Sequence, residues 1–277
     1  MRNLLMMATF AVCCGCATPY SGGQTSSQVS QQKAGAHEVS LSLDPAGKNV
    51  EAKSFLSGKE LLNEVNRLGG VRGEYETNAA FSKRMEQFGN FSVRGEVLAS
   101  QIKFDRVTGE FFLEASMGDA QGFGFRSNSR VGKDPKIEYP SYQLSEDIYS
   151  EGQYVGQNSF GASASIEKRR IDRYYLVFSA VPKTPGRVVF YKVTGKLKIT
   201  AAEMEKEREN IRIVFTVMPT PDYLQTAKHF GTPTISNPYE SQVNDYFFQA
   251  KVFWVTIVNI KSGKVYDDEA RLSLKIL

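Results

Sequence analysis

Through most of the chain beyond Asn90, apolar residues recur at every second position, and this period constrains the fold more than any other feature. In Glu110–Met117, for example, Phe111, Leu113 and Ala115 fall on one side. A period of two is typical of strands with one buried face and one wet face. Further strands are expected at Ser92–Leu98, Gln101–Asp105, Tyr174–Val181, Arg187–Val193, Lys196–Ile199, Ile211–Met218, Phe247–Ile260 and Arg271–Ile276. The sequence therefore predicts an α+β fold that is predominantly antiparallel β-sheet.

Two turn signals separate neighbouring strands. Lys183-Thr184-Pro185-Gly186 stands between Tyr174–Val181 and Arg187–Val193, so these two strands are expected to pair as a hairpin. Lys261-Ser262-Gly263 ends the strand Phe247–Ile260 and leads to the closing strand.

Capping residues predict two N-terminal helices and one short surface helix. Ser57 and Glu60 form a capping box ahead of an apolar face, and Gly69-Gly70 ends that helix. Thr77 can cap a second helix. A second capping box begins at Thr200, and the helix after it is so rich in charge that it is expected on the surface.

The first eighteen residues have the layout of a secretory signal whose cleavage site adjoins a cysteine. Arg2 precedes an apolar run from Leu4 to Val12, and Gly15 is followed by Cys16. A run of about nine residues fits the central region of a signal peptide and is far shorter than the roughly 20 residues that span a bilayer. These residues resemble the lipobox of bacterial lipoproteins, although Cys13 stands where that family prefers leucine.

The resemblance implies that Cys16 becomes the acylated first residue of the mature protein. Because Ala17 is not aspartate, it also implies retention at the outer membrane, on the periplasmic or the surface face. The predicted organisation is a signal peptide at 1–15, the lipidated cysteine and a flexible Ser/Gln/Gly-rich tether at 16–53, and a single α+β domain at 54–277. A short strand could fall within Gly35–Val50.

The residue inventory excludes several chemistries. All three cysteines lie in the leader region, at positions 13, 14 and 16, so the mature domain has neither a disulfide nor a catalytic thiol. His37 and His229 are the only histidines, too few for a zinc site, and Asp267-Asp268-Glu269 lacks the alternating pattern of a calcium loop. A net charge of +4 does not indicate a nucleic-acid partner. We expect no metal and no other cofactor.

Pro219–Asp245 is the segment that most suggests function. It carries four prolines and several aromatic residues, so the prediction is a long loop, with a short helix at Asp222–Phe230. Aromatic rings on a stiff loop make a contact surface at low entropic cost. The alternative is that the loop folds these rings back over the core. The candidate binding residues are Tyr223, His229, Phe230, Tyr239 and Tyr246.

The run Lys168-Arg169-Arg170-Ile171-Asp172-Arg173 is the densest positive segment. In an envelope protein, its partners would be lipid phosphates, lipopolysaccharide or an acidic protein surface. The alternative is a solvated hairpin end. Its candidate residues for an anionic partner are Lys168, Arg169, Arg170 and Arg173.

No residue pattern identifies a catalytic site. Gly73-Glu74-Tyr75-Glu76-Thr77, with Phe81 and Arg84, resembles a segment of uncharacterised exported bacterial proteins, and that resemblance implies no activity. We therefore expect a lipid-anchored envelope protein that acts as a non-enzymatic binding or structural module, with an envelope protein or a glycan as partner. The alternative is a hydrolase of envelope polymers whose carboxylates come from several strands, because Glu110 and Glu114 on one strand would lie about 13 Å apart.

Overall fold

The computed structural model describes residues 37–40, 43, 45–116, 125–130, 138–178 and 189–276. All of these belong to one compact unit, Gly35–Leu277. The signal peptide, Cys16, the first part of the predicted tether and the Lys183–Gly186 turn lie outside the described residues.

Within the described ranges, one sheet has five strands, and its neighbouring strands all pair antiparallel. Across the sheet the order is β1 (His37–Ser40), β13 (Arg271–Ile276), β9 (Val189–Leu197), β5 (Glu110–Ser116) and β4 (Ile102–Asp105).

The other sheet has eight strands in the part of the chain that the structure describes, and it mixes parallel and antiparallel pairs. Its order is β2 (Lys53–Phe55), β3 (Phe91–Glu96), β10 (Ile211–Gly231), β11 (Tyr239–Asn259), β8 (Ser163–Phe178), β7 (Glu138–Gln157) and β6 (Phe125–Arg130), and β12 (Val265–Asp267) pairs with β11. The β2–β3 and β8–β11 pairs are parallel, and the others are antiparallel. This is the β-rich α+β fold that the alternating pattern predicts.

The three α-helices among the described residues begin after hydroxyl caps. In α1 (Gly58–Arg67), Ser57 Oγ accepts a hydrogen bond from the Glu60 amide. In α2 (Asn78–Met85) and α3 (Ala201–Glu207), Thr77 and Thr200 have the same role. Short 3-10 turns complete the described elements, at η1 (Pro45–Asn49), η2 (Glu86–Phe88), η3 (Ala99–Gln101) and η4 (Arg208–Asn210).

The main core joins both sheets with α1 and α2. Phe215 on β10 is fully buried, and its ring centroid lies 5.1 Å from that of Tyr142 and 5.8 Å from that of Phe178. The helices add Leu61 and Phe81 to the same cluster. Each such side chain stabilises the fold by about 1.5–3 kcal/mol. Because no cysteine occurs among the described residues, this core is the main source of their stability.

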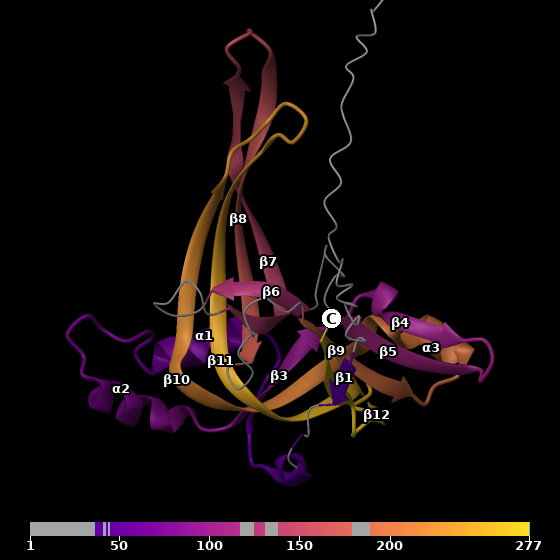
Figure 1. The fold of residues 1–277 in the computed structure, drawn as a ribbon. Helices are drawn as coiled ribbons and strands as arrows, with labels where there is room; N and C mark the ends of the chain where they lie inside the picture. The colour runs from indigo at the N-terminus through magenta and orange to yellow at the C-terminus, as the bar shows by residue number, and fades with distance from the viewer. Residues whose placement is uncertain are drawn as a thin grey trace, which may run out of the picture. The chain divides into compact units, whose positions relative to one another are not determined.

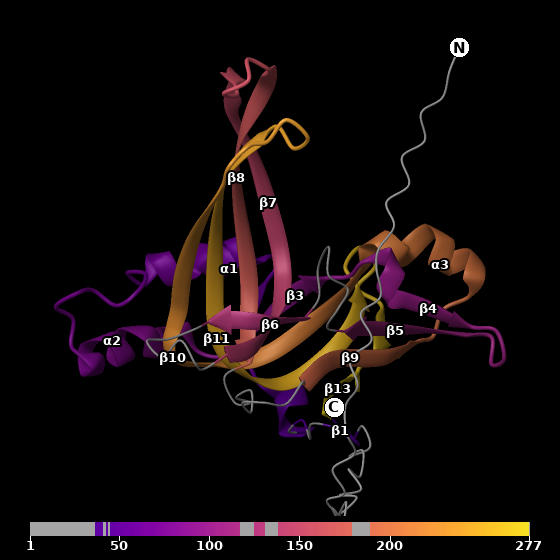
Figure 2. The same cartoon turned by 45° about the horizontal axis from the view of Figure 1, so that its top comes forward.

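Four long strands continue past the rest of the eight-stranded sheet. Among the described pairings, β3 reaches only Val217 on β10, and β6 reaches only Tyr142 on β7. Beyond these points β10, β11, β8 and β7 run side by side (Figures 1 and 2). We call residues 143–178 and 219–250 the four-strand arm.

The predicted loop at Pro219–Asp245 is wrong, and so is the helix within it. The segment belongs to β10 and β11, which are joined by residues 232–238. Proline has no backbone N–H to donate to a neighbouring strand, so it is tolerated at bulges and at strand edges. Pro219 immediately precedes a bulge, where the register with β11 shifts before Leu224. Positive φ angles at Asp222 and Tyr223 mark this bulge.

The predicted hairpin between Tyr174–Val181 and Arg187–Val193 is also wrong. β8 ends at Phe178 in the eight-stranded sheet, whereas β9 pairs with β13 and β5 in the other sheet. Turn chemistry favours a reversal of the chain, but it does not decide which strands become partners.

Structure begins earlier than the predicted end of the tether at Lys53. His37–Ser40 forms β1, which pairs with β13, and Lys53–Phe55 pairs with β3. A polar segment of four residues can be ordered because backbone pairing with a distant strand replaces the apolar burial that it lacks.

Candidate binding face on the four-strand arm

The two faces of the arm carry different side chains, because successive residues of a strand point to opposite sides. The face on which α1 lies is called the helix-side face. Gly58 marks this contact, since a Cβ added there would overlap with the Cβ of Tyr174, and its amide donates to Ser145 Oγ at 3.3 Å. From the register, the helix-side face carries Asp147, Tyr149, Arg170, Asp172, Tyr174, Thr226, Lys228, Gln242, Asn244 and Tyr246.

Two matching rows form the centre of this face. Arg170-x-Asp172-x-Tyr174 on β8 lies in register with Gln242-x-Asn244-x-Tyr246 on β11. Asn244 Nδ2 donates to Asp172 Oδ1 at 2.6 Å, and the two tyrosine rings stack with centroids 5.3 Å apart. Gln242 Nε2 donates to Asn244 Oδ1 at 3.3 Å. The rows therefore hold each other in place across the parallel pair of strands.

Arg170 is held mainly by charge and by ring stacking. Its guanidinium lies 4.4 Å from the centroid of the Tyr149 ring, and its Nε lies 3.7 Å from Asp172 Oδ2. Nε is buried and has no hydrogen-bond acceptor among the described residues. The side chain is 39% exposed, so the charged group still reaches the surface.

Lys59 and Asp147 complete the network at the α1 end. Lys59 Nζ donates to Tyr149 Oη at 3.0 Å, and Tyr149 Oη donates to Asp147 Oδ2 at 3.2 Å. Burial, and then the negative charge of Asp147, raise the pKa of Tyr174 above its usual value. Tyr246 also has a raised pKa, chiefly from burial. Both phenols therefore remain neutral hydrogen-bonding groups near pH 7.

A hollow of about 490 Å³ opens on this face. Polar and charged side chains predominate around it, and a tyrosine ring stands at its side. The lining residues are Arg170, Thr226, Ala227, Lys228, Gln242, Asn244 and Tyr246. Arg170 and Lys228 are the charged residues in this described lining, and the carboxylates of Asp172 and Glu151 lie just behind it, 3.7 Å and 4.0 Å from Arg170 Nε.

The four cations predicted to form one patch are divided between the two faces. Lys168 and Arg170 lie on the helix-side face, whereas Arg169 and Arg173 lie on the other. Arg169 pairs with Glu167 at 2.7 Å and stacks 3.6 Å from the centroid of the Tyr239 ring. The segment is a continuous strand rather than a hairpin end, and its period of two separates the charges.

The five predicted binding residues are likewise not brought together. Tyr223, at the bulge, packs edge-on against Phe81 of α2, with ring centroids 5.6 Å apart. Phe230 and Tyr246 lie on the helix-side face, and His229 and Tyr239 on the opposite one. Tyr246 alone lines the hollow.

His229 belongs to a salt-bridge cluster on the opposite face. Asp245 is 5% exposed and accepts two hydrogen bonds from Arg173, at 2.7 Å from Nε and 3.0 Å from the terminal nitrogen. His229 Nε2 lies 3.2 Å from Asp245 Oδ2. The carboxylate joins β10, β11 and β8, which indicates a structural role.

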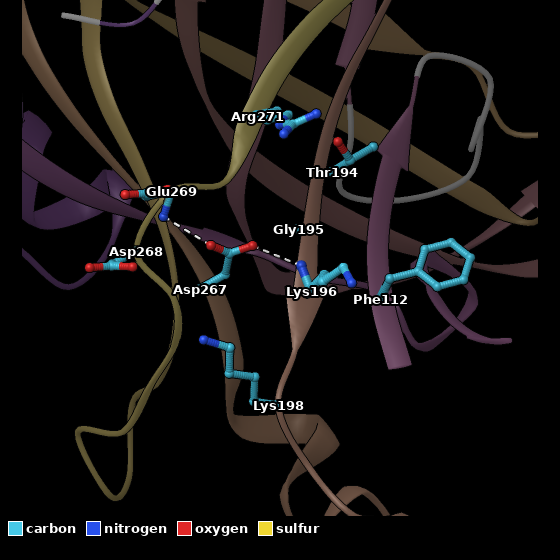
Figure 3. Close-up of a pocket in the computed structure, with 9 residues that line it drawn as sticks. All are labelled: Phe112, Thr194, Gly195, Lys196, Lys198, Asp267, Asp268, Glu269 and Arg271. Carbon is cyan, nitrogen blue, oxygen red and sulfur yellow. Dashed lines mark hydrogen bonds between the residues drawn. The ribbon is translucent and has the colours of Figure 1, made fainter. Parts of the chain in front are cut away.

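Another hollow, of about 420 Å³, lies where β9 passes the Asp267–Glu269 turn. Figure 3 shows the residues that line it. Asp267 accepts hydrogen bonds from the backbone amides of Lys196 at 2.7 Å and Glu269 at 2.9 Å. Asp268 is paired with Lys48. The acidic run therefore stabilises a turn, and no group of three or more metal-ligating side chains occurs in the part of the chain that the structure describes.

Tyr149, Thr226, Lys228, Gln242 and Asn244 were missed by sequence reasoning. The repeated polar-x-polar-x-Tyr pattern at 170–174 and 242–246 was the signal that could have found two of them. Its meaning depends on the register of β8 with β11, which no local pattern shows.

The comparisons with known proteins assign neither the fold nor the helix-side face to a known family. No family model matches the chain, and no significant match exists among curated proteins or solved structures. Within the described residues, no helix is long and apolar enough to cross a membrane.

Proposed function

We propose that this chain is a lipid-anchored protein of the bacterial outer membrane that binds an acidic saccharide, without catalysis, on the helix-side face of the four-strand arm. The observation that carries the proposal is the hollow beside the paired rows at 170–174 and 242–246, with Arg170, Lys228 and polar side chains in its lining. The lipobox resemblance at Cys16 supports the anchor.

The groups around the hollow suit a sugar. A sugar presents an edge of hydroxyls and a face of C–H groups. The amides of Gln242 and Asn244 and the hydroxyl of Thr226 can donate to and accept from hydroxyls. The ring of Tyr246 can pack against the C–H face. Small-ligand sites commonly combine such a ring with a few fixed polar groups.

The cations specify an acidic ligand. Arg170 and Lys228 both line the hollow, and Arg170 can hold a carboxylate or phosphate through two nitrogens. The contacts with Tyr149 and Asp172 already position Arg170, so little side-chain entropy is lost on binding.

Lys228→Gln is expected to weaken binding of an acidic saccharide about tenfold, because a hydrogen bond to a charged group contributes about 1.5–3 kcal/mol. Titration calorimetry with a lipid-free acidic core oligosaccharide of lipopolysaccharide measures this change. Lys83→Gln, an exposed cation on α2, is the matched control and should bind like the parent protein. Equal affinity of Lys228→Gln and the parent, or equal binding of neutral dextran, would contradict the proposal.

One observation favours the hydrolase alternative. Burial raises the pKa of Glu96 on β3; the positive charge of Arg212 lowers it, and the negative charge of Asp147 on β7 raises it again. A carboxyl with a raised pKa, near a second carboxylate from another strand, is what a general acid requires.

Glu96→Gln separates catalysis from structure. A hydrolase would release soluble fragments from purified peptidoglycan and lose that activity in the variant, whereas we expect no fragments from either protein.

Because the pKa of Glu96 is raised in the folded state, its protonation stabilises the fold at low pH, and this stability is lost as the pH rises through the folded pKa. Urea denaturation should therefore show that Glu96→Gln loses less stability than the parent between pH 4 and pH 7.

A further inference from the structure

A second hollow on the arm, of about 360 Å³, lies at its far end, where the β7–β8 hairpin meets the turn between β10 and β11. Figure 1 shows this turn beside the hairpin. The Glu167 amide on β8 donates to the Pro238 carbonyl at 3.0 Å, which fixes the turn in this place. We call this second hollow the tip hollow, and the one lined by Arg170 and Lys228 the central hollow.

The two hollows open on the same face of the arm. Tyr154 and Ile166, which line the tip hollow, are partners in the register of β7 with β8. Ile166 stands four residues before Arg170 on β8, and residues an even number apart on a strand share a face. At about 3.3 Å per residue, the two levels lie about 13 Å apart. One extended ligand on the helix-side face can therefore reach both hollows.

Side chains that contact one another occupy the level between the hollows. Lys168 and Glu240 are partners in the register of β8 with β11. Glu240 Oε2 accepts a hydrogen bond from Tyr154 Oη at 2.7 Å, and Lys168 Nζ lies 5.2 Å from the centroid of the Tyr154 ring. The cation and the carboxylate balance each other, and together they fix the ring of Tyr154 beside the tip hollow.

The two hollows differ in charge. None of the described residues that line the tip hollow is charged, whereas both charged residues that line the central hollow are cations. The tip hollow instead offers the ring of Tyr154, the side-chain amides of Gln157 and Asn158, and the hydroxyl of Thr234. A ring beside amides and a hydroxyl suits the C–H face and the hydroxyl groups of a neutral sugar.

Internal hydrogen bonds hold both turns beside the tip hollow. Asn158 Oδ1 accepts from the amides of Phe160 and Ala162, each at 3.0 Å. Thr234 and Asn237 exchange two backbone hydrogen bonds, at 2.9 Å and 3.2 Å, and Thr234 Oγ1 accepts a third from the Asn237 amide at 3.0 Å. Because the turns are already ordered, little conformational entropy is lost when a ligand enters.

We propose that the tip hollow is a second sugar subsite, which binds neutral sugars of the same chain whose acidic part occupies the central hollow. This inference rests on the proposed function and names its ligand class more closely, as an acidic saccharide that is extended by neutral sugars. A lipopolysaccharide whose acidic core carries a neutral O-chain has this composition. Two linked contacts on one rigid face strengthen each other, because binding at one raises the effective concentration at the other.

Titration calorimetry with two lipid-free saccharides tests the second subsite. One is the acidic core oligosaccharide alone, and the other is the same core with its neutral O-chain. The parent protein should bind the longer saccharide about a hundredfold more tightly, since a linked second contact raises affinity by about 10²–10⁴. Tyr154→Ala should remove this gain and leave the affinity for the core unchanged. Tyr239→Ala is the matched control and should keep the gain, because Tyr239 is equally exposed, at 37%, and lies on the opposite face.

Ile235→Ser is a second variant of the tip hollow that leaves the Tyr154–Glu240 hydrogen bond in place. Ile235 is 60% exposed, so the fold should tolerate the change, and the gain for the longer saccharide should fall while core binding stays the same. Equal affinity of the parent for both saccharides, or the same gain in Tyr154→Ala as in Tyr239→Ala, would overturn the second subsite and leave the proposed function intact. Binding of neither saccharide would overturn the proposed function, and the second subsite with it.

Discussion

Asp245→Ala is expected to lower the free energy of unfolding by about 3–5 kcal/mol. Asp245 is buried between β10 and β8, and it accepts both hydrogen bonds that hold the guanidinium of Arg173. Removing the carboxylate leaves Arg173, whose side chain is only 21% exposed, without its partner. His229 is 60% exposed and adds little to this cost.

Urea denaturation of the parent protein and of two variants measures this loss. Asp268→Ala is the matched control, because Asp268 forms an ion pair with Lys48 in which both side chains are about half exposed. That substitution should cost much less than Asp245→Ala, because exposed ion pairs contribute little to stability. If Asp245→Ala cost no more than Asp268→Ala, the cluster on the opposite face would not hold the arm together.

Cys16→Ser is expected to move the protein from the membrane fraction to the soluble fraction. An anchor of several acyl chains contributes about 0.8 kcal/mol per buried CH₂ and is effectively permanent, so its loss should release almost all of the protein. Fractionation of cells that express the variant, followed by immunoblotting, measures the change.

Cys14→Ala is the matched control, since it removes a neighbouring thiol and places a small residue in the signal. It should remain in the membrane fraction. Unchanged fractionation of Cys16→Ser would contradict the lipid anchor. It would leave the saccharide site untouched, because that site depends only on the four-strand arm.

Much of the fold could be predicted because its signals are local. Arg271–Ile276 alternates in the sequence and is a strand, and Lys261-Ser262-Gly263 is a turn. Gly263 has a φ of +73°, which glycine adopts without strain. Local spacing and backbone chemistry are sufficient for such elements.

Prolines predict a loop at 219–245, but an outer strand and a bulge accommodate Pro219 and Pro221. β10 is an outer strand of the arm, so one of its edges needs no partner. At the bulge, the ring of Tyr223 packs against Phe81. The cost of a missing N–H depends on whether another strand requires it, and this is a property of the whole sheet.

The candidate site could not be predicted because it depends on pairing between distant segments. Arg170 lies beside Gln242 only because β8 and β11 pair in parallel. The neighbouring contact in the same register, between Asp172 and Asn244, joins residues 72 positions apart in the sequence. Arg169 and Arg170 are neighbours in the sequence, but they lie on opposite faces because successive residues of β8 point to opposite sides. Composition indicated cations and aromatic residues, and the sheet decided which of them share a face.

The central claim is that the helix-side face of the arm binds an acidic saccharide. Its most direct test is a map of backbone amide chemical shifts during titration with the lipid-free acidic core oligosaccharide. The account predicts that the largest shifts fall at Thr226–Lys228 and Gln242–Tyr246, with none at the hollow of Figure 3. Shifts confined to Thr194–Lys198 and Asp267–Arg271, or no shifts at all, would contradict it.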